Sequence, residues 1–265
     1  MKKLAFVAAL ALTLALLLGG PAPAGTVLDR ILKTGELVVA TTGTQPPLSI
    51  TSKGGEIIGL DADIAKLIAS SLGVKVRFSK MLFTELIPAL ESGKADMIIS
   101  GMTMTPERNA KVPFIGPYFV SGKGILCKEK SLAALDKEGL DSPKFKVAAL
   151  KGSTSQIFVE TVTPQAKLVA AASYDEALDL LFQDKIDVLV ADFPFCVYCV
   201  SRYADKGLTV RGGRLTFEPL GIGVQEDPLL LNWLENLLKI LAGTGELNKL
   251  HDRWFKDTSW VKQLP

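Results

Sequence analysis

Short apolar runs rich in β-branched residues alternate along this chain with longer segments whose apolar residues recur every three or four positions. The short runs predict β-strands at residues 37–40, 75–78, 97–99, 146–149, 167–169 and 188–190. The longer segments predict helices at residues 61–72, 84–92, 154–161, 174–183, 228–242 and 245–255. Because strands and helices alternate, the pattern indicates an α/β fold with βα units and mainly parallel sheets.

Residues at the ends of two segments support their assignment as helices. Asp61 precedes apolar residues at helical spacing and is an expected cap, and Gly73 follows as the expected C-terminal glycine. Thr84 begins the next segment, and Gly93 ends it. Both helices therefore have start and stop signals in addition to their periodicity.

Two extended segments that are far apart in the sequence predict a molecule with two lobes. The chain has 265 residues, 48% of them hydrophobic, which is enough for one large domain or two small ones. Residues 118–127 and 220–224 both have an extended pattern, which indicates that the chain crosses between two lobes twice. On this interpretation residues 25–119 and 218–265 form the first lobe, and residues 120–217 form the second.

The N-terminal residues 1–24 have the pattern of a secretory signal peptide. Lys2 and Lys3 precede an unbroken apolar run at residues 4–18, and Ala22-Pro23-Ala24 provides an A-x-A cleavage site. A membrane anchor is the alternative, but the run is shorter than the roughly 20 residues that span a bilayer. We expect cleavage near Ala24 and a soluble periplasmic protein, without a lipid anchor because no cysteine lies near the cleavage site.

The balance of charge argues against polyanions as partners. The chain has 30 Lys and Arg residues and 28 Asp and Glu residues. Two of the basic residues, Lys2 and Lys3, lie in the leader, so the mature chain carries equal numbers of both signs. Nucleic-acid binding needs a basic excess or stripe, and we expect no nucleic-acid partner.

The cysteines and the single histidine leave alternatives open. Cys196 and Cys199 have the CxxC spacing of redox and metal sites, but no second pair or nearby histidine completes a zinc site. Their apolar neighbours favour two small buried residues on a helix, although export also permits a disulfide, local or with Cys127. His251 lies in a helical pattern and is expected to be structural. The sequence implies no metal and no cofactor.

The segment SGMTMTPER at residues 100–108 is the leading candidate for a binding site. Ser100-Gly101 follows a predicted strand, and in α/β sheets ligands bind beyond the carboxyl ends of strands. Thr105-Pro106 is a helix-start signal whose free N–H groups favour an anion, and Arg108 adds a planar fork that suits a carboxylate. The pattern predicts a small carboxylate as ligand. The alternative is that Arg108 pairs with Glu107 or reaches solvent.

Two long runs of residues resemble a known family. They are FTELIPALESGKADMIISGMTMTPERNAKVPFIGPYFVSG at residues 83–122 and GLDADIAKLIASSLG at residues 59–73, in which Ala62 departs from a usual larger aliphatic residue. Both resemble the amino-acid-binding proteins of ABC importers, which are solute-binding proteins of family 3, and the order of the remaining parts matches over nearly the whole mature chain. The resemblance implies the type II periplasmic binding protein fold, in which two α/β lobes joined by two extended hinge strands close on a ligand.

In the first lobe the resemblance implies part of a clamp for an amino acid. Arg108 is similar to the arginine that binds the ligand α-carboxylate. Ser100, Gly101 and Thr103 resemble the loop that contacts the α-carboxylate and the α-amine. Phe83 is similar to an aromatic residue that packs on the ligand, with a place in the core as the alternative.

In the second lobe the resemblance implies the remainder of the clamp. Gly152-Ser153-Thr154 resembles a Gly-Thr loop at a helix start, whose N–H groups also face the carboxylate. Asp192, which follows a predicted strand, resembles the acid that binds the α-ammonium. The alternatives are that Ser153 or Thr154 only caps a helix and that Asp192 is an N-cap. A cationic fork in one lobe and an acid in the other are what a zwitterion requires.

One loop departs from the pattern of the family. In TGTQPPLSI, residues 42–50, Thr42 stands where many relatives carry an acid, Gln45 where they carry an aromatic residue and Leu48 where Phe is common. Without that acid a cationic ligand lacks a partner for its buried charge. We therefore expect an amino acid with a polar or neutral side chain.

These observations predict a binding protein that captures an amino acid and presents it to an ABC permease, with a monomer expected. An enzyme is the second hypothesis, because a periplasmic dehydratase of prephenate or arogenate has the same fold. That enzyme would need a general acid, for which Glu85 and Glu218 are candidates, although both are expected on the surface. An ammonium-binding Asp192 argues against it. A sensor input domain, the third hypothesis, would need a separate signalling partner.

Overall fold

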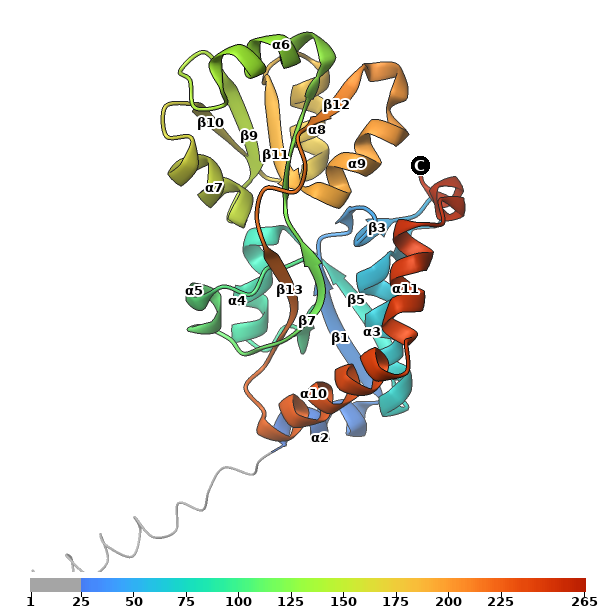
Figure 1. Ribbon diagram of the computed structural model, residues 1–265. Helices are drawn as coiled ribbons and strands as arrows, with labels where there is room; N and C mark the ends of the chain where they lie inside the picture. Colours follow the sequence, from blue (N-terminus) through green and yellow to red (C-terminus); the bar gives the residue numbers. More distant parts are fainter. Residues whose placement is uncertain (1–24) are drawn as a thin grey trace, which may run out of the picture.

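The computed structural model describes residues 25–265 as two lobes, one above the other in Figure 1, and each lobe is built on one five-stranded sheet. The sheet of the first lobe has the order β5 (Lys75–Lys80), β1 (Glu36–Thr41), β6 (Met97–Ile98), β13 (Glu218–Val224) and β7 (Phe114–Ser121). The sheet of the second lobe has the order β10 (Lys167–Ala171), β9 (Lys146–Leu150), β11 (Val188–Asp192), β8 (Lys123–Lys128) and β12 (Leu208–Arg211). The predicted signal peptide, residues 1–24, lies outside the described residues.

Each sheet is only half parallel. In the first lobe β1 pairs in parallel with β5 and β6, whereas β13 runs antiparallel to β6 and β7. In the second lobe β9 pairs in parallel with β10 and β11, whereas β8 runs antiparallel to β11 and β12. The prediction of mainly parallel sheets is therefore wrong for half of the pairings. The strands that carry the chain from lobe to lobe, β7 with β8 and β13, are the ones that introduce the antiparallel pairs (Figure 1).

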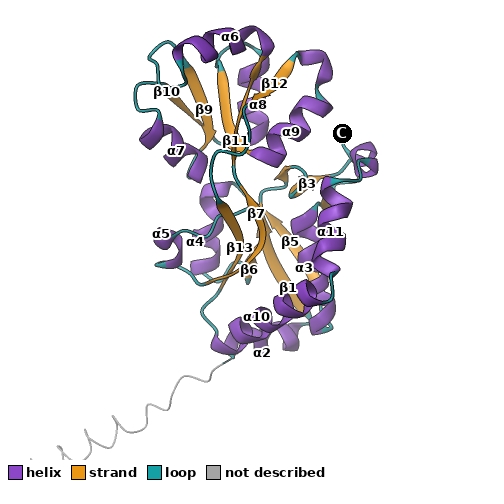
Figure 2. Ribbon diagram, in the orientation of Figure 1, coloured by secondary structure: helices purple, strands orange, loops and turns teal. Residues whose placement is uncertain are grey.

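Helices cover the sheets of both lobes, as Figure 2 shows. In the first lobe they are α2 (Thr26–Thr34), α3 (Leu60–Leu72), η1 (Phe83–Glu85), α4 (Leu86–Glu91), α5 (Pro106–Asn109), α10 (Pro228–Gly243), α11 (Glu246–Phe255) and η3 (Ser259–Gln263). In the second lobe they are α6 (Glu129–Glu138), α7 (Thr154–Val162), α8 (Tyr174–Phe182), α9 (Phe193–Arg202) and η2 (Ala204–Lys206). Within residues 25–265, none of the helices combines the length and the apolar character needed to cross a bilayer.

The predicted strands and long helices are confirmed, with shifts of one or two residues at their ends. The predicted helix at residues 84–92 is divided into the single turn η1 and the helix α4. The small sheet of β2 (Thr44–Gln45), β3 (Ser49–Thr51) and β4 (Ile57–Ile58) was not predicted, and neither were α2, α6 and β12. Strands of two or three residues are too short to show a period in the sequence.

Asp61 does not cap α3, which corrects one prediction. The helix begins at Leu60 with Gly59 in the N-cap position, so Asp61 lies inside the first turn. Its side chain is buried and accepts a hydrogen bond from the Tyr118 hydroxyl, with 2.8 Å between the oxygens. Gly73 ends the helix in the left-handed conformation, as expected.

The two lobes pack against each other through apolar side chains. A single cluster of buried residues contains Phe83, Leu86 and Leu90 of the first lobe together with Leu150 and Tyr174 of the second. Each lobe also has a separate core behind its own sheet. The loops at the carboxyl ends of β1, β6, β9 and β11 meet where the lobes touch, and the candidate site lies there.

Candidate ligand-binding site

The loop after β6 folds as its sequence predicts. Thr105 is the N-cap of α5, its hydroxyl oxygen accepts from the backbone N–H of Arg108, and Pro106 occupies the first turn. Gly101 has a positive φ of 56°, and a Cβ there would lie 2.7 Å from Oε1 of Gln45. Glycine at this position lets the loop approach the neighbouring β2–β3 segment closely.

Arg108 points into the boundary between the lobes. Its Nη1 donates to the carbonyl oxygen of Thr103 at 2.7 Å, and its Nη2 donates to the carbonyl oxygen of Gly152 at 3.1 Å. The guanidinium carbon lies 5.4 Å from the centre of the Phe83 ring. The residue is 8% exposed whereas Glu107 is exposed, so the alternative of a local pair with Glu107 or a solvent contact is wrong. Burial lowers the pKa of Arg108, and the nearby Glu218 and Asp192 carboxylates oppose that shift.

Asp192 ends β11 and faces Arg108 from the second lobe. One carboxylate oxygen, Oδ1, accepts from Lys123 Nζ at 2.9 Å, and the other, Oδ2, accepts from Gln45 Nε2 at 2.5 Å. Asp192 stands at the N-cap position of α9, but its side chain is turned toward these two residues instead of toward the helix. The buried carboxylate is therefore held by groups that lie between the lobes.

Ser153 and Thr154 have different roles at the start of α7. The Ser153 hydroxyl oxygen accepts from the backbone N–H groups of Ser155 and Gln156, and the hydroxyl donates to Leu150. For the side chain of Ser153 the alternative of a helix cap is therefore correct. The Thr154 hydroxyl instead donates to Glu218 at 2.9 Å and points into the site.

Eight of the ten predicted site residues line one small cavity between the lobes: Gln45, Phe83, Gly101, Thr103, Arg108, Ser153, Thr154 and Asp192. Ser100 and Thr42 lie beside it and bond to each other, since Ser100 Oγ accepts from the Thr42 N–H at 3.0 Å. Thr42 instead lines a neighbouring cleft of about 270 Å³, which also lies between the lobes and shares Phe83 and Leu150 with the cavity. The cavity itself encloses about 10 Å³, because polar side chains bond across it. That space is about the size of one water molecule.

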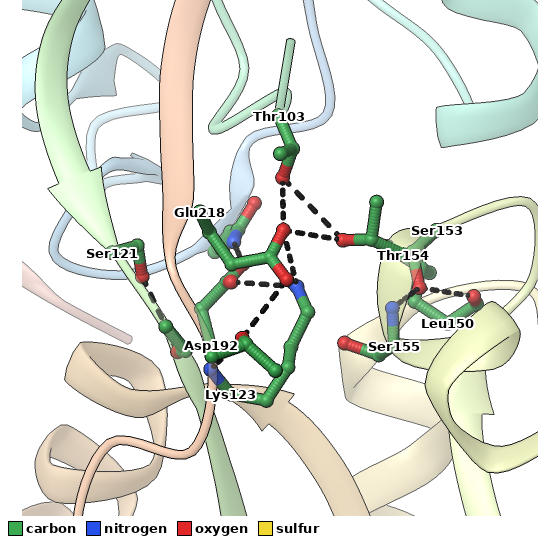
Figure 3. A network of polar contacts seen from close by, with 12 residues as sticks. Thr103, Ser121, Lys123, Leu150, Ser153, Thr154, Ser155, Asp192 and Glu218 are labelled. Atoms are coloured by element: carbon green, nitrogen blue, oxygen red, sulfur yellow. Dashed lines mark hydrogen bonds and ion pairs between the residues drawn. The ribbon is translucent and has the colours of Figure 1, made fainter. Parts of the chain in front are cut away.

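Two charged residues in the centre of the site were not predicted to be there. Lys123, the first residue of β8, is 2% exposed, and its Nζ lies 2.9 Å from Asp192 and 3.6 Å from Glu218 (Figure 3). Glu218, the first residue of β13, is 7% exposed, so its predicted place on the hinge surface is wrong. A lone lysine inside an extended apolar segment was the available signal, because a buried ammonium needs an acidic partner.

Glu218 is the most heavily bonded acid of the site. Its Oε2 accepts from the hydroxyls of Thr103 at 2.7 Å and Thr154 at 2.9 Å (Figure 3). Its Oε1 accepts from the hydroxyl of Thr216 at 2.9 Å. Burial opposes ionisation of this carboxyl, but Lys123 and the three hydroxyls outweigh burial and hold its pKa below the ordinary value. Glu85, by contrast, is exposed as predicted and accepts from the Leu82 N–H.

The remaining chemical candidates do not line the cavity. Cys127, Cys196 and Cys199 are buried free thiols, and burial raises the pKa of Cys127 to about 11. His251 lies 3.0 Å from the Tyr118 carbonyl oxygen and packs edge-on against Phe119, which is a structural role. Among residues 25–265 there is no group of three or more metal-ligating side chains.

Comparison with known proteins identifies the family. Residues 37–257 match the bacterial extracellular solute-binding proteins, family 3. The chain belongs to this family. It is 29% identical to the ABC transporter arginine-binding protein 1 of Escherichia coli (strain K12) over 218 residues, which cover 81% of this chain and 88% of that protein.

Two further relatives broaden this picture. The ABC transporter glutamine-binding protein GlnH of Bacillus subtilis (strain 168) is 31% identical over 208 residues, 77% of this chain and 74% of that one. A solved structure of an ancestral amino acid-binding protein, described as a precursor of cyclohexadienyl dehydratase, superposes with a TM-score of 0.80. That protein is 38% identical, and the match covers 87% of this chain and all of the ancestral one. The fold found here is thus shared with an amino acid-binding protein of known structure, and the two transport proteins are named for binding arginine and glutamine.

Proposed function

We propose that this protein captures an amino acid between its lobes in the periplasm and delivers it to the membrane permease of an ABC importer. The observation that supports this most is the placement of Arg108 and Asp192 at one cavity, each from a different lobe. An α-amino acid is a zwitterion, and a buried carboxylate and ammonium each need an opposite charge. A ligand that bonds to both residues stabilises the closed arrangement of the lobes, which is how binding drives closure.

The other site residues complete the clamp in this proposal. Arg108 and the N–H groups at the start of α7, around Ser153 and Thr154, hold the α-carboxylate. Thr103 and the Gly101 backbone contact the same end of the ligand, and Phe83 packs on its carbon atoms. Ser100 and Thr42 support the loop from the side, consistent with their hydrogen bond to each other.

Closure in this proposal occurs about the two connections between the lobes. The hinges lie near residues 119–120 and 217–218, so residues 25–119 with 218–265 move against residues 120–217. The strands β7 and β13 pair with each other up to Ser121 and Glu218, at the junction of the lobes. This pairing allows both connections to bend at the same level.

For the ligand we propose a polar or neutral side chain. Gln45 is 2% exposed and bonded to Asp192, and its amide replaces the aromatic wall expected from the resemblance. Thr42 lines the cleft that adjoins the cavity, so at this position the side chain of the ligand meets a hydroxyl instead of an acid. The charged residues elsewhere in the lining of the cleft, Lys80 and Glu85, have opposite signs. Of the relatives named above, one is named for binding arginine and one for binding glutamine. A binding assay of this chain distinguishes a cationic ligand such as arginine from a neutral ligand such as glutamine.

Export and assembly belong to the same proposal. Residues 1–24 act as a cleaved signal peptide, and the mature monomer meets its permease in the inner membrane. The family description, extracellular solute-binding, is consistent with this location.

A second candidate is a cyclohexadienyl dehydratase, favoured by the resemblance to an ancestral precursor of that enzyme. A general acid must hold a proton at the working pH. The pKa of Glu218 lies below its ordinary value, so this carboxyl is arranged as an anion, and the Asp192 carboxyl is engaged by the Lys123 ammonium. This arrangement favours binding over acid catalysis.

Calorimetry on the mature chain, unfolded and refolded to remove bound ligand, tests both candidates. The twenty amino acids are titrated after ranking by thermal shift, because a ligand raises the free energy of unfolding by RT ln(1 + [L]/Kd). We expect tight binding within one group of polar or neutral amino acids, with loss in Arg108→Ala and Asp192→Ala. Consumption of prephenate or arogenate without amino-acid binding would replace the transport proposal with the enzyme.

A further inference from the structure

Two charged side chains from the connections between the lobes occupy the centre of the site. We call Lys123 and Glu218 the resident pair. They begin the strands β8 and β13, and both are buried at the junction of the lobes. Their charged atoms, Lys123 Nζ and Glu218 Oε2, lie 3.6 Å apart, so the site contains a carboxylate and an ammonium that belong to the chain itself (Figure 3).

The carboxylate of the resident pair joins the lobes. Glu218 Oε2 accepts from Thr103 of the first lobe and from Thr154 of the second, at 2.7 and 2.9 Å. The proposed function assigns the surroundings of these two threonines to the carboxylate of the ligand. Charge-assisted hydrogen bonds of this length are among the stronger polar contacts in proteins, so Glu218 holds the threonines together.

The ammonium of the resident pair bonds to the acid assigned to the ligand. Lys123 Nζ donates to Asp192 Oδ1 at 2.9 Å, while Gln45 donates to Oδ2. Both oxygens of Asp192 therefore accept hydrogen bonds from side chains of the chain itself. Since about 10 Å³ remains inside the cavity, a ligand has to displace these contacts to enter.

We propose that the resident pair occupies the ammonium and carboxylate positions of the amino acid, holds the lobes closed without it and is displaced when it binds. This inference rests on the proposed function. On displacement the ligand ammonium replaces Lys123 on Asp192, and the ligand carboxylate replaces Glu218 near Thr103 and Thr154. Lys123 and Glu218 then remain bonded to each other, as their present separation allows.

The displaced pair also sets the class of ligand. Arg108 and Asp192 are used by the two α-groups of the amino acid, and Lys123 and Glu218 neutralise each other. Neither Asp192 nor Glu218 is then available to pair with a cationic side chain, and burying an unpaired charge is costly. The resident pair therefore selects a neutral side chain over lysine or arginine.

Occupancy by the resident pair lowers the apparent affinity. The apparent Kd rises in proportion as the binding-competent fraction falls, so a pair that holds about nine molecules in ten closed weakens binding about tenfold. A purely structural ion pair has a different consequence, because its removal changes stability and leaves affinity unchanged. The two roles can be separated by measurement.

The test uses the double variant Lys123→Met/Glu218→Gln, which removes both charges and keeps the shapes. Lys239→Met/Glu235→Gln is the matched control, an exposed ion pair on α10 with its charged atoms 3.1 Å apart. We expect the double variant, stripped of ligand, to bind the preferred amino acid about tenfold more tightly than the wild type or the control. Small-angle scattering should show a larger radius of gyration for the ligand-free double variant, because its lobes separate.

The single variant Lys123→Met tests the ligand class. It leaves Glu218 without its cation, so the affinity for arginine and lysine should rise relative to the neutral ligand. If Lys123→Met fails to fold, which thermal unfolding reveals, Glu218→Gln tests the same link in the opposite direction. It leaves Lys123 without Glu218 as its anion after displacement, so discrimination against arginine and lysine should increase.

Three results distinguish failure of this inference from failure of the proposed function. Equal affinity and equal scattering for the wild type and the double variant would show that the pair is only structural. Unchanged discrimination against arginine in a folded Lys123→Met would overturn the link to ligand class. If no amino acid binds either protein, the proposed function fails, and the scattering comparison still decides whether the pair holds the lobes closed.

Discussion

The guanidinium of Arg108, in the first lobe, donates a hydrogen bond to the carbonyl oxygen of Gly152, in the second, across 3.1 Å. Its other terminal nitrogen donates to Thr103 at 2.7 Å. Five N–H donors are available on the fork, so these bonds leave donors for a carboxylate. The same side chain can thus bind a ligand and tie the loops on either side of it.

Arg108→Lys should therefore weaken amino-acid binding nearly as much as Arg108→Ala. Lysine keeps the positive charge but loses the planar fork that holds a carboxylate by two bonds. We expect the Kd measured by calorimetry to rise about a hundredfold or more in both variants. The control is Arg77→Ala. It removes an exposed arginine on the outer strand β5 that pairs with Glu36 on β1, and it should bind the amino acid as the wild type does. A Kd for Arg108→Lys within a few fold of the wild type would rule out the fork as the carboxylate ligand.

Gly59 should be among the least replaceable residues of the first lobe. Its φ is 127°, and a Cβ at this position would lie 2.1 Å from the carbonyl oxygen of Leu48, a backbone atom. Gly59→Ala should lower the free energy of unfolding by roughly 2 kcal/mol or more in urea denaturation. Gly73→Ala is the control, since Gly73 also has a positive φ but no atom within 4 Å of the added Cβ. The clash argument fails if the two alanine variants are equally destabilised.

Asp227 joins the starts of two helices. Its Oδ1 accepts from the N–H groups of Leu229 and Leu230 at the start of α10, and its Oδ2 accepts from Val27 and Leu28 at the start of α2. Burial opposes ionisation, but these four N–H groups outweigh it and hold the pKa of the carboxyl below its ordinary value. The stabilisation is therefore present above the pKa of the unfolded chain and is lost as the pH falls through the lower folded value.

Asp227→Ala should lower the free energy of unfolding by about 2 kcal/mol at neutral pH, a typical cost at the upper end for a helix cap. The difference between wild type and variant should shrink as the pH falls below about 4, where the carboxyl of the unfolded chain becomes protonated and that of the folded protein follows at lower pH. Urea unfolding over this range measures the difference, with the exposed Asp205→Ala as control. A difference that does not depend on pH would mean that the carboxylate charge contributes nothing.

Parts of this molecule that depend on neighbours in the sequence could be predicted. The long helices and buried strands show their own periodicity, and the cap at Thr105, the glycine at Gly101 and Arg108 lie within one short segment. Asp192 could be placed because it follows a buried strand, and loops after such strands meet at one edge of the fold. The resemblance to a family then indicated which of these residues belong together.

Contacts between distant segments could not be predicted in the same way. Lys123 and Asp192 are separated by 69 positions, and Thr103 and Glu218 by 115. Nothing local in the sequence shows that Glu218 turns inward from its strand instead of facing solvent. The antiparallel pairing of β13 with β6 likewise depends on where the returning chain enters the sheet.

Asp61 should make the stability of the protein fall as the pH rises from about 4 to about 7. Burial of its side chain raises its pKa to about 7, while the Tyr118 hydroxyl and the Gly101 N–H partly oppose the shift. In this interval the unfolded chain releases the proton and the folded chain keeps it, so the free energy of unfolding decreases.

Asp61→Asn keeps an acceptor for Tyr118 and removes the ionisation. Relative to the wild type, the variant should gain stability with rising pH, by up to about 4 kcal/mol for a shift of roughly three pH units. Urea unfolding of both proteins between pH values of about 4 and about 8 measures this gain, and Asp205→Asn should show none. A constant difference between Asp61→Asn and the wild type across this range would show that Asp61 titrates at its ordinary value in the folded protein.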